Sequence, residues 1–214
     1  MKVDHIVARI DTAPEKHLRH NQLYAHVTDG SVTRDQLKRL VIAKHQALGS
    51  EIAAYTLLLN RFRSPVPAGY FAFTIHTLTE SYPRLLKAGQ SLGLEEEEIC
   101  REPVSRPIRH LAQFLAWIGL HAGAGEAALA IRTDYAVWGG TCGAFADGLR
   151  ELDVPREVVR FLETEERVPE QILEGASEVI EYGLAHGENE GNITRSALQV
   201  VEVQGDAWEW ISRG

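Results

Sequence analysis

The sequence predicts one all-α domain, residues 1–214, folded as a helical bundle. Apolar side chains recur every three or four residues along most of the chain, a pattern typical of amphipathic helices. No segment of strand length alternates β-branched and polar residues, so no sheet is expected. The stretch 126–152 is apolar or small on nearly every side of a helix, which predicts a buried helix at the centre of the bundle.

Signals for helix ends divide the bundle into roughly seven or eight helices. Asp29-Gly30 is expected to end an early helix, and Thr33 to cap a long helix that follows. Ser81-Tyr82-Pro83 is expected to break the chain between two helices, and Asn192 to cap the last helix. The expected helices cover 15–27, 33–62, 68–79, 83–92, 105–123, 126–152, 153–185 with a break at Pro169, and 192 through Trp208, after a short arm at 4–13.

Composition narrows the functional classes. The formal net charge of −8, with basic residues scattered singly, argues against a nucleic-acid-binding protein. No apolar run approaches the roughly 18 residues of a membrane span, and no signal peptide precedes the bundle. The two cysteines, Cys100 and Cys142, lack the spacing of a metal site and are expected to be reduced thiols. A soluble, cytoplasmic protein is therefore expected.

Two charged residues interrupt the apolar face of the helix over 33–62. Lys44 and Glu51 lie seven residues apart, two turns along the same side of the helix. One interpretation is that they bracket a ligand. The other is that the Lys44 stem packs along the surface while Glu51 meets an arginine of a neighbouring helix. Tyr55 follows on the same face.

The central helix carries a carboxylate in surroundings that disfavour its charge. Asp134 is the one acid between Arg132 and Asp147, and burial costs several kcal/mol unless the acid is paired or protonated. It is therefore either a satisfied structural acid or part of a pocket. Trp138 and Cys142 share a face of this helix; Cys142 is either an inert buried thiol or a nucleophile activated by a distant base.

Familiar catalytic signatures are missing from the sequence. There is no phosphate-binding glycine loop, HExxH, GxSxG or EF-hand motif, and no Glu-x-x-His pair of the kind that di-iron bundles use. His76 and Glu80, four residues apart, could share a metal ion, with a partly exposed helix face as the plainer interpretation. No metal site and no cofactor is predicted; iron is the one cofactor left open.

Four segments together resemble the TenA/THI-4/PqqC group, whose members have a haem-oxygenase-like helical fold. They are Asn21-Gln22-Leu23-Tyr24 leading to the Asp29-Gly30 turn, Ser91-Leu92-Gly93-Leu94, the central stretch, and 178–187 followed by a last helix with Glu202 and Trp208. The resemblance covers nearly the whole chain through short, degenerate motifs. It implies the haem-oxygenase-like fold and a homodimer or higher oligomer.

The resemblance also places residues of this chain at functional positions of the group. Lys44 stands where thiaminase-type members have the amine-binding Asp, and Asp134 where they have the nucleophilic Cys; Trp138 replaces a pocket Tyr. Glu202 corresponds to the late catalytic Glu. With nucleophile and amine-binding acid both replaced, standard thiaminase II hydrolysis is not expected. The ligand sets of the di-iron and PqqC branches are not reproduced either.

The sequence therefore predicts a small-molecule pocket in the helical core. Asp134, Glu51 and Glu202 are the candidate acid/base residues, and Lys44, Tyr55, Trp138 and Cys142 the candidate ligand-binding residues. We expect Lys44 to orient an anionic or carbonyl group, and Trp138 with Tyr55 to stack on a flat ring. The leading hypothesis is a divergent hydrolase or oxidase of a small heterocycle, thiamine-related or similar. A non-catalytic binding or regulatory protein is the alternative, and a metal-dependent oxidase with an unusual ligand set a weaker one.

Overall fold

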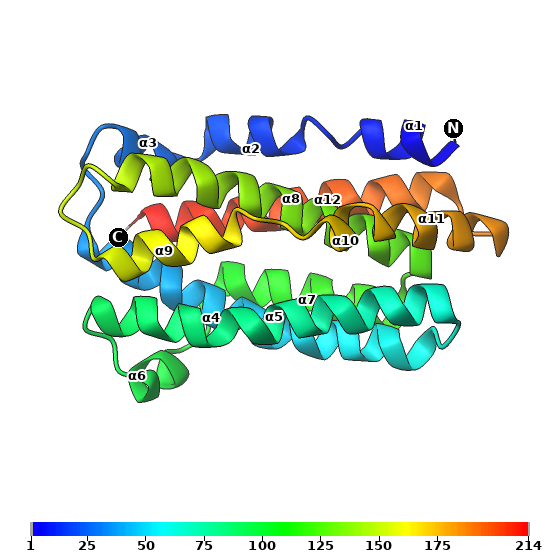
Figure 1. Cartoon of the computed structure of the whole chain (residues 1–214), viewed down its shortest axis with the longest axis horizontal. Helices are drawn as coiled ribbons and strands as arrows, with labels where there is room; N and C mark the ends of the chain where they lie inside the picture. Colours follow the sequence, from blue (N-terminus) through cyan, green and yellow to red (C-terminus); the bar gives the residue numbers. More distant parts are fainter. Residues whose placement is uncertain (1, 214) are drawn as a thin grey trace.

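The computed structural model describes residues 2–213, and the part described contains helices and no strand (Figure 1). The prediction of an all-α fold is therefore confirmed. The helices are α1 (Lys2–Ala8), α2 (Ala13–His20), α3 (Gln22–Thr28), α4 (Arg34–Arg61), α5 (Pro65–Ser91), α6 (Glu96–Arg101), α7 (Arg106–His121), α8 (Ala124–Leu149), α9 (Arg156–Glu165), α10 (Glu170–Leu173), α11 (Gly175–Ala185) and α12 (Glu190–Ser212).

The described residues form more helices than the seven or eight expected, because short segments were merged or overlooked. The expected helix over 15–27 is in fact α2 and α3. Asn21 separates them in an extended conformation, and its side-chain oxygen accepts a hydrogen bond from the Tyr24 backbone N–H at 3.2 Å. Asn21 therefore ends α2 and is the N-cap of α3.

The break expected at Ser81-Tyr82-Pro83 does not occur. Helix α5 continues through Pro83, which is exposed. Proline cannot donate to the carbonyl four residues earlier, that of Thr79, and Thr79 is also exposed, so solvent can satisfy that carbonyl. The continuous helix carries Ser81 and Arg84 on one rigid element.

The caps of the two helices that frame the core differ in how well the sequence predicted them. Thr33 caps α4 as expected, in a reciprocal capping box with Gln36. The cap of α12 is Asn189, not Asn192: its side chain accepts a hydrogen bond from the Gly191 N–H at 2.8 Å. The last helix therefore begins three residues earlier than expected.

Helix α8 lies at the centre of the bundle, as the composition of 126–152 predicts. It packs against α12, α11, α9 and α2, while α4 packs against α5 and α7 (Figure 1). The elongated bundle thus has one group of helices around α8 and another around α4, and the two termini lie toward opposite ends of its long axis. Within the described chain, no helix has the length and apolarity needed to cross a membrane.

The hydrophobic core is divided into two clusters, and polar side chains lie at the boundary on four helices. Each of α4, α5, α8 and α12 contributes to both clusters and passes from one to the other along its length. Helices α5, α8 and α12 pass between the clusters in the same order, and α4 passes between them in the reverse order. The polar or amphipathic residues at the boundary are Lys44, Ser81, Trp138 and Gln204. The fold therefore gathers them into one layer across the core.

Candidate functional site

Lys44 and Glu51 form a buried ion pair within α4. The Lys44 Nζ lies 3.2 Å from both carboxylate oxygens of Glu51, and the two side chains are 8% and 5% exposed. Neither expected arrangement is found: the residues meet each other directly across about 10 Å of helix rise. Burial alone would lower the pKa of Lys44, but the nearby carboxylates, Glu51 foremost, raise it, so Lys44 stays charged.

Asp134 of α8 is held by the side-chain amide of Gln204 from α12. The amide donates to the Asp134 Oδ1 and, at 3.2 Å, to its backbone carbonyl. Burial and then the charge of Glu51 raise the pKa of Asp134 to about 7, against the opposing effects of Lys44 and of the amide. Near neutral pH this carboxyl group is populated in both protonation states, as an acid/base catalyst requires.

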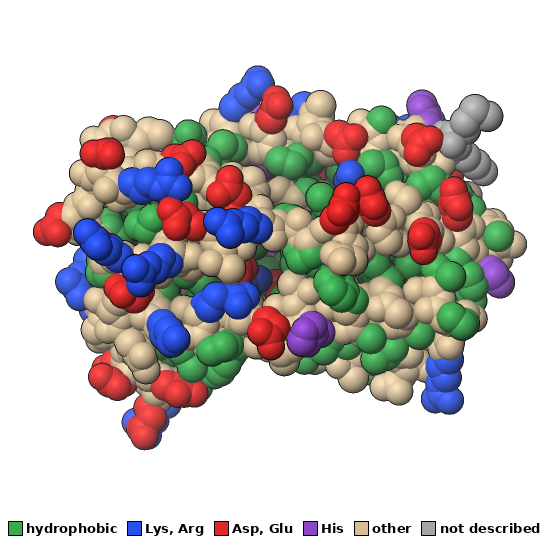
Figure 2. Space-filling view, in the orientation of Figure 1, with side chains coloured by type: hydrophobic (Ala, Val, Ile, Leu, Met, Phe, Trp, Pro, Cys, Tyr) green, Lys and Arg blue, Asp and Glu red, His purple; other side chains and the backbone are tan. Residues whose placement is uncertain are grey.

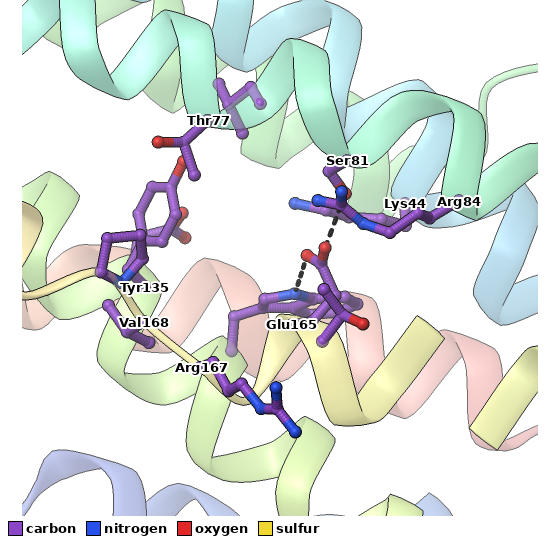
Figure 3. Close-up of a pocket in the computed structure, with 13 residues that line it drawn as sticks. Lys44, Thr77, Ser81, Arg84, Tyr135, Glu165, Arg167 and Val168 are labelled. Carbon is purple, nitrogen blue, oxygen red and sulfur yellow. Dashed lines mark hydrogen bonds between the residues drawn. The ribbon is translucent and has the colours of Figure 1, made fainter. Parts of the chain in front are cut away.

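Trp138 links the ion pair to a second carboxylate. Its indole Nε1 donates to Glu165 Oε2 at 2.9 Å, while the Ser81 hydroxyl donates to the other oxygen at 2.6 Å (Figure 3). The Lys44 ammonium lies 4.8 Å from the centroid of the Trp138 ring, within range of a cation–π interaction. Trp208 stacks on Trp138 with centroids 5.3 Å apart. Trp138 is thus fixed in position.

Two cavities share the walls formed by Lys44, Asp134 and Trp138. The larger, about 190 Å³, lies among α4, α5, α8 and the end of α9, and its wall includes Tyr135 and Glu165 (Figure 3). The smaller, about 40 Å³, is mainly apolar and is lined by residues of α4, α7, α8 and α12. The larger of the two has room for a small ligand, and Asp134 borders both.

Several buried polar atoms around these cavities have no hydrogen-bond partner among the described residues. They are the hydroxyls of Tyr55 and Tyr135, the Oε1 of Gln204 and the Nε of Arg84. Burial, with the charges of Asp134 and Glu51, raises the pKa of Tyr55, and similar causes raise that of Tyr135, so both remain neutral phenols. Buried polar groups are nearly always paired in folded proteins, so the members of this group that border a cavity, Tyr135, Arg84 and Gln204, can accommodate polar atoms of a bound molecule or ordered water.

The structure brings together most of the predicted site residues. Lys44, Asp134 and Trp138 border both cavities, and Glu51 borders the smaller one. Tyr55 is fully buried beside them but does not border either cavity. Trp208 and the Lys44 ammonium already contact the Trp138 ring, and Tyr55 borders neither cavity, so this arrangement does not favour the expected stacking of Trp138 with Tyr55 on a flat ring.

Two predicted residues are placed elsewhere. Glu202 is exposed on α12 and borders neither cavity; Gln204, two residues on, occupies the inward position. Cys142 is fully buried in the core and also borders neither cavity, and burial followed by the charge of Glu165 raises its pKa well above the usual value. An inert thiol is the interpretation that the structure favours.

Four residues beside the cavities are not among the predicted ones: Glu165, Ser81, Arg84 and Gln204. The sequence does contain a signal for Gln204 as a site residue, because this polar residue interrupts the apolar face of the last helix. Ser81 was obscured by the break expected at Pro83. The sequence contains no such signal for Glu165, because this residue ends α9 in a polar stretch. Only the packing of α9 against α5 and α8 brings Glu165 to Trp138.

The suggested metal pair on α5 is not supported by its surroundings. His76 and Glu80 are both exposed. Among the residues that the structure describes, no three His, Cys, Asp or Glu side chains are grouped so as to hold a metal ion.

Solved structures of other proteins share this fold. A TenA homologue from P. horikoshii matches with a TM-score of 0.77 over 97% of this chain and 98% of its own, at 12% sequence identity. A TenA family transcription regulator from Silicibacter sp. matches with a TM-score of 0.79 over 98% and 97%, at 9% identity. A domain from Shewanella denitrificans described as having a heme oxygenase-like fold matches with a TM-score of 0.73 over 99% and 91%, at 14% identity. No protein-family model and no curated protein matches the sequence.

These similarities confirm the haem-oxygenase-like, TenA-like fold that the sequence motifs suggested. They extend over nearly the entire chain, so the fold is shared as a whole. The low identities mean that the residues of the site must be interpreted from their own surroundings.

Proposed function

We propose that this chain binds a small heterocyclic molecule in the larger cavity and acts on it by acid/base chemistry, as a divergent hydrolase of the TenA/PqqC-like group. The observation that carries the proposal is Asp134, a carboxyl group on a cavity wall with a pKa of about 7. One of its oxygens accepts from Gln204, and the other is left for a ligand or a water molecule. The inert Cys142 favours attack by water over a cysteine nucleophile.

The other residues support this role by position and charge. Glu51 neutralises Lys44, so the ammonium stays protonated beside the cavity and can orient a carbonyl or anionic group of the substrate. The aromatic side chains of Trp138 and Tyr135 provide apolar contact for a flat ring. Asp134 would then take a proton from water and return it to the leaving group.

A panel of pyrimidines, thiamine fragments and quinones tests the pocket by thermal unfolding. A ligand present at about 100 times its dissociation constant adds about 2.7 kcal/mol of stability, which shifts the melting temperature measurably. Products of bound compounds are then followed by mass spectrometry. If no compound in the panel shifts the melting temperature, the proposal of a heterocycle pocket of this kind is overturned.

Asp134→Asn separates catalysis from binding. The substitution keeps the side-chain shape and the oxygen that accepts from Gln204 but cannot take up a proton. We expect binding within a fewfold of the wild type and turnover lower by about 10²–10⁴-fold. Turnover at the wild-type rate in the variant would contradict the acid/base role.

The second candidate is ligand binding without turnover. Its support is that Asp134 and Glu165 already accept hydrogen bonds from protein groups and that Glu51 is paired, which suits a fixed binding site. One structural neighbour is itself described as a transcription regulator. Saturable binding that Asp134→Asn weakens, with no product from any bound compound, would favour this candidate.

A further inference from the structure

Arg84 is a cationic side chain on the wall of the larger cavity that the proposed chemistry does not use. It lies on α5, one turn beyond Ser81 on the same face. Figure 3 shows Arg84 and Lys44 reaching toward the cavity from the same side, near the carboxylate of Glu165. Helix α5 thus provides a hydroxyl and a guanidinium group to this wall.

The guanidinium group of Arg84 has no partner in the part of the chain that the structure describes. Its Nε is buried and makes no hydrogen bond, and no carboxylate pairs with the group. Lys44 is paired with Glu51, and both oxygens of the Glu165 carboxylate already accept hydrogen bonds, from the Ser81 hydroxyl and an indole N–H. A buried guanidinium N–H without an acceptor is unfavourable, and an anion in the cavity that accepts from it would relieve that cost.

The surroundings of the cavity add further positive charge. Arg167, in the segment that follows α9, also borders the cavity and is exposed. On the face seen in Figure 2, lysine and arginine side chains gather over α9 and the adjoining part of α5, interspersed with acids. In a chain with a net charge of −8, this half of the face stands out as the more basic one.

We propose that Arg84 is the binding residue for an anionic substituent, so that the ligand of this cavity is a heterocycle carrying a phosphate or a carboxylate. The planar guanidinium donates paired hydrogen bonds to either group. Arg167 also borders the cavity and adds a second positive charge, and the heterocycle would lie beside Asp134. The substrate class rests on the proposed function, whereas the anion site itself can be tested without it.

Inorganic phosphate tests the anion site directly. Thermal unfolding is followed in 1–50 mM phosphate against chloride at matched ionic strength, a range chosen for weak binding. We expect saturable stabilisation of the wild type that Arg84→Gln abolishes. Lys87→Gln is the matched control, since Lys87 is an exposed cation one turn further along α5 that borders no described cavity, and it should respond like the wild type.

Matched compound pairs identify the anionic group. Thiamine is compared with thiamine monophosphate, and nicotinamide with nicotinate, by calorimetry. We expect the member that carries the phosphate or carboxylate in at least one pair to bind about tenfold more tightly, which is about 1.4 kcal/mol. Arg84→Gln should remove that difference and leave the binding of the member without the anionic group unaffected. Preference in the first pair indicates phosphate, and in the second carboxylate.

The outcomes separate the two proposals. Heterocycles that bind with no preference for the anionic member, together with no effect of phosphate, would overturn the anion site and leave the proposed function standing. Phosphate binding that requires Arg84, without binding of any heterocycle, would support the anion site and overturn the proposed ligand. Urea unfolding of Arg84→Gln checks that the variant is folded. Arg167→Gln changes an exposed residue of the cavity wall and should reduce phosphate affinity less than Arg84→Gln.

Discussion

At the scale of single residues, the site is built from charges that interrupt apolar helix faces. Lys44 and Asp134 could be singled out from the sequence because each is the odd residue in an apolar pattern. Glu51 could be singled out on the same face as Lys44, but not its direct pairing with Lys44. The partner of Asp134 could not be predicted, because Gln204 reaches it from α12, 70 residues along the chain. Pairing across helices depends on how the helices pack, which residue spacing alone does not encode.

The pH dependence of stability reports the environment of Asp134. Its pKa rises from 3.8 to about 7 on folding, so between these values the native state holds a proton that the unfolded chain has released. Stability from this residue is therefore full below about pH 4 and is lost as the pH rises to 7. Relative to Asp134→Asn, the wild type should lose on the order of 2 kcal/mol between pH 5 and pH 8 in urea unfolding. Parallel curves for the two proteins would contradict the raised pKa.

The buried ion pair should show strong non-additivity. Lys44→Met leaves Glu51 buried without its cation, and we expect a loss of about 3–5 kcal/mol in the free energy of unfolding. The double variant Lys44→Met/Glu51→Leu removes both charges and should recover most of that loss. A double-variant cycle by chemical denaturation measures the coupling; independent, additive effects would show that the pair is not formed.

At the scale of helices, the site depends on elements whose continuity the sequence obscured. Thr33 and the apolar stripe predicted α4 closely, because local capping and periodicity agree there. Pro83 suggested a break that tertiary packing overrides, and the continuous α5 places Ser81 and Arg84 together on the cavity wall. Local signals therefore sufficed for α4 and not for α5.

Close packing of α7 on α4 should be sensitive to a single methyl group. A Cβ at Gly119 would lie 3.0 Å from the backbone oxygen of Ala54, so Gly119→Ala should destabilise the fold by about 1–3 kcal/mol. Gly49→Ala is the control: Gly49 lies within α4 with nothing near its added Cβ, and the change should stabilise by up to about 1 kcal/mol. Urea unfolding compares the two; equal effects would contradict the close approach.

At the scale of the whole molecule, the polar layer separates two apolar clusters that the same four helices span. Because α4, α5, α8 and α12 each contribute to both clusters, neither cluster should unfold alone. We therefore expect one calorimetric transition for the chain, with equal van't Hoff and calorimetric enthalpies, as for a single domain. Two resolved transitions would contradict this.

The overall fold was far more predictable than the detail of the site. Helical periodicity and the apolar central stretch, α8, specify an all-α bundle, and the same motifs pointed to the fold shared with TenA homologues. The position of Glu165 beside Trp138, and of Arg84 on the cavity wall, arises only when α9 and α5 pack together. Those residues lie on partly polar faces, where sequence patterns do not distinguish function from solvation.

The most direct test of the central claim is a crystal structure of the protein saturated with whichever compound of the thermal-unfolding panel stabilises it most. The account predicts a flat ring in the larger cavity, in contact with Trp138 and Tyr135, with a polar atom about 2.6–3.2 Å from the Asp134 carboxyl group. A compound bound elsewhere, with the cavity beside Asp134 holding only water, would contradict it.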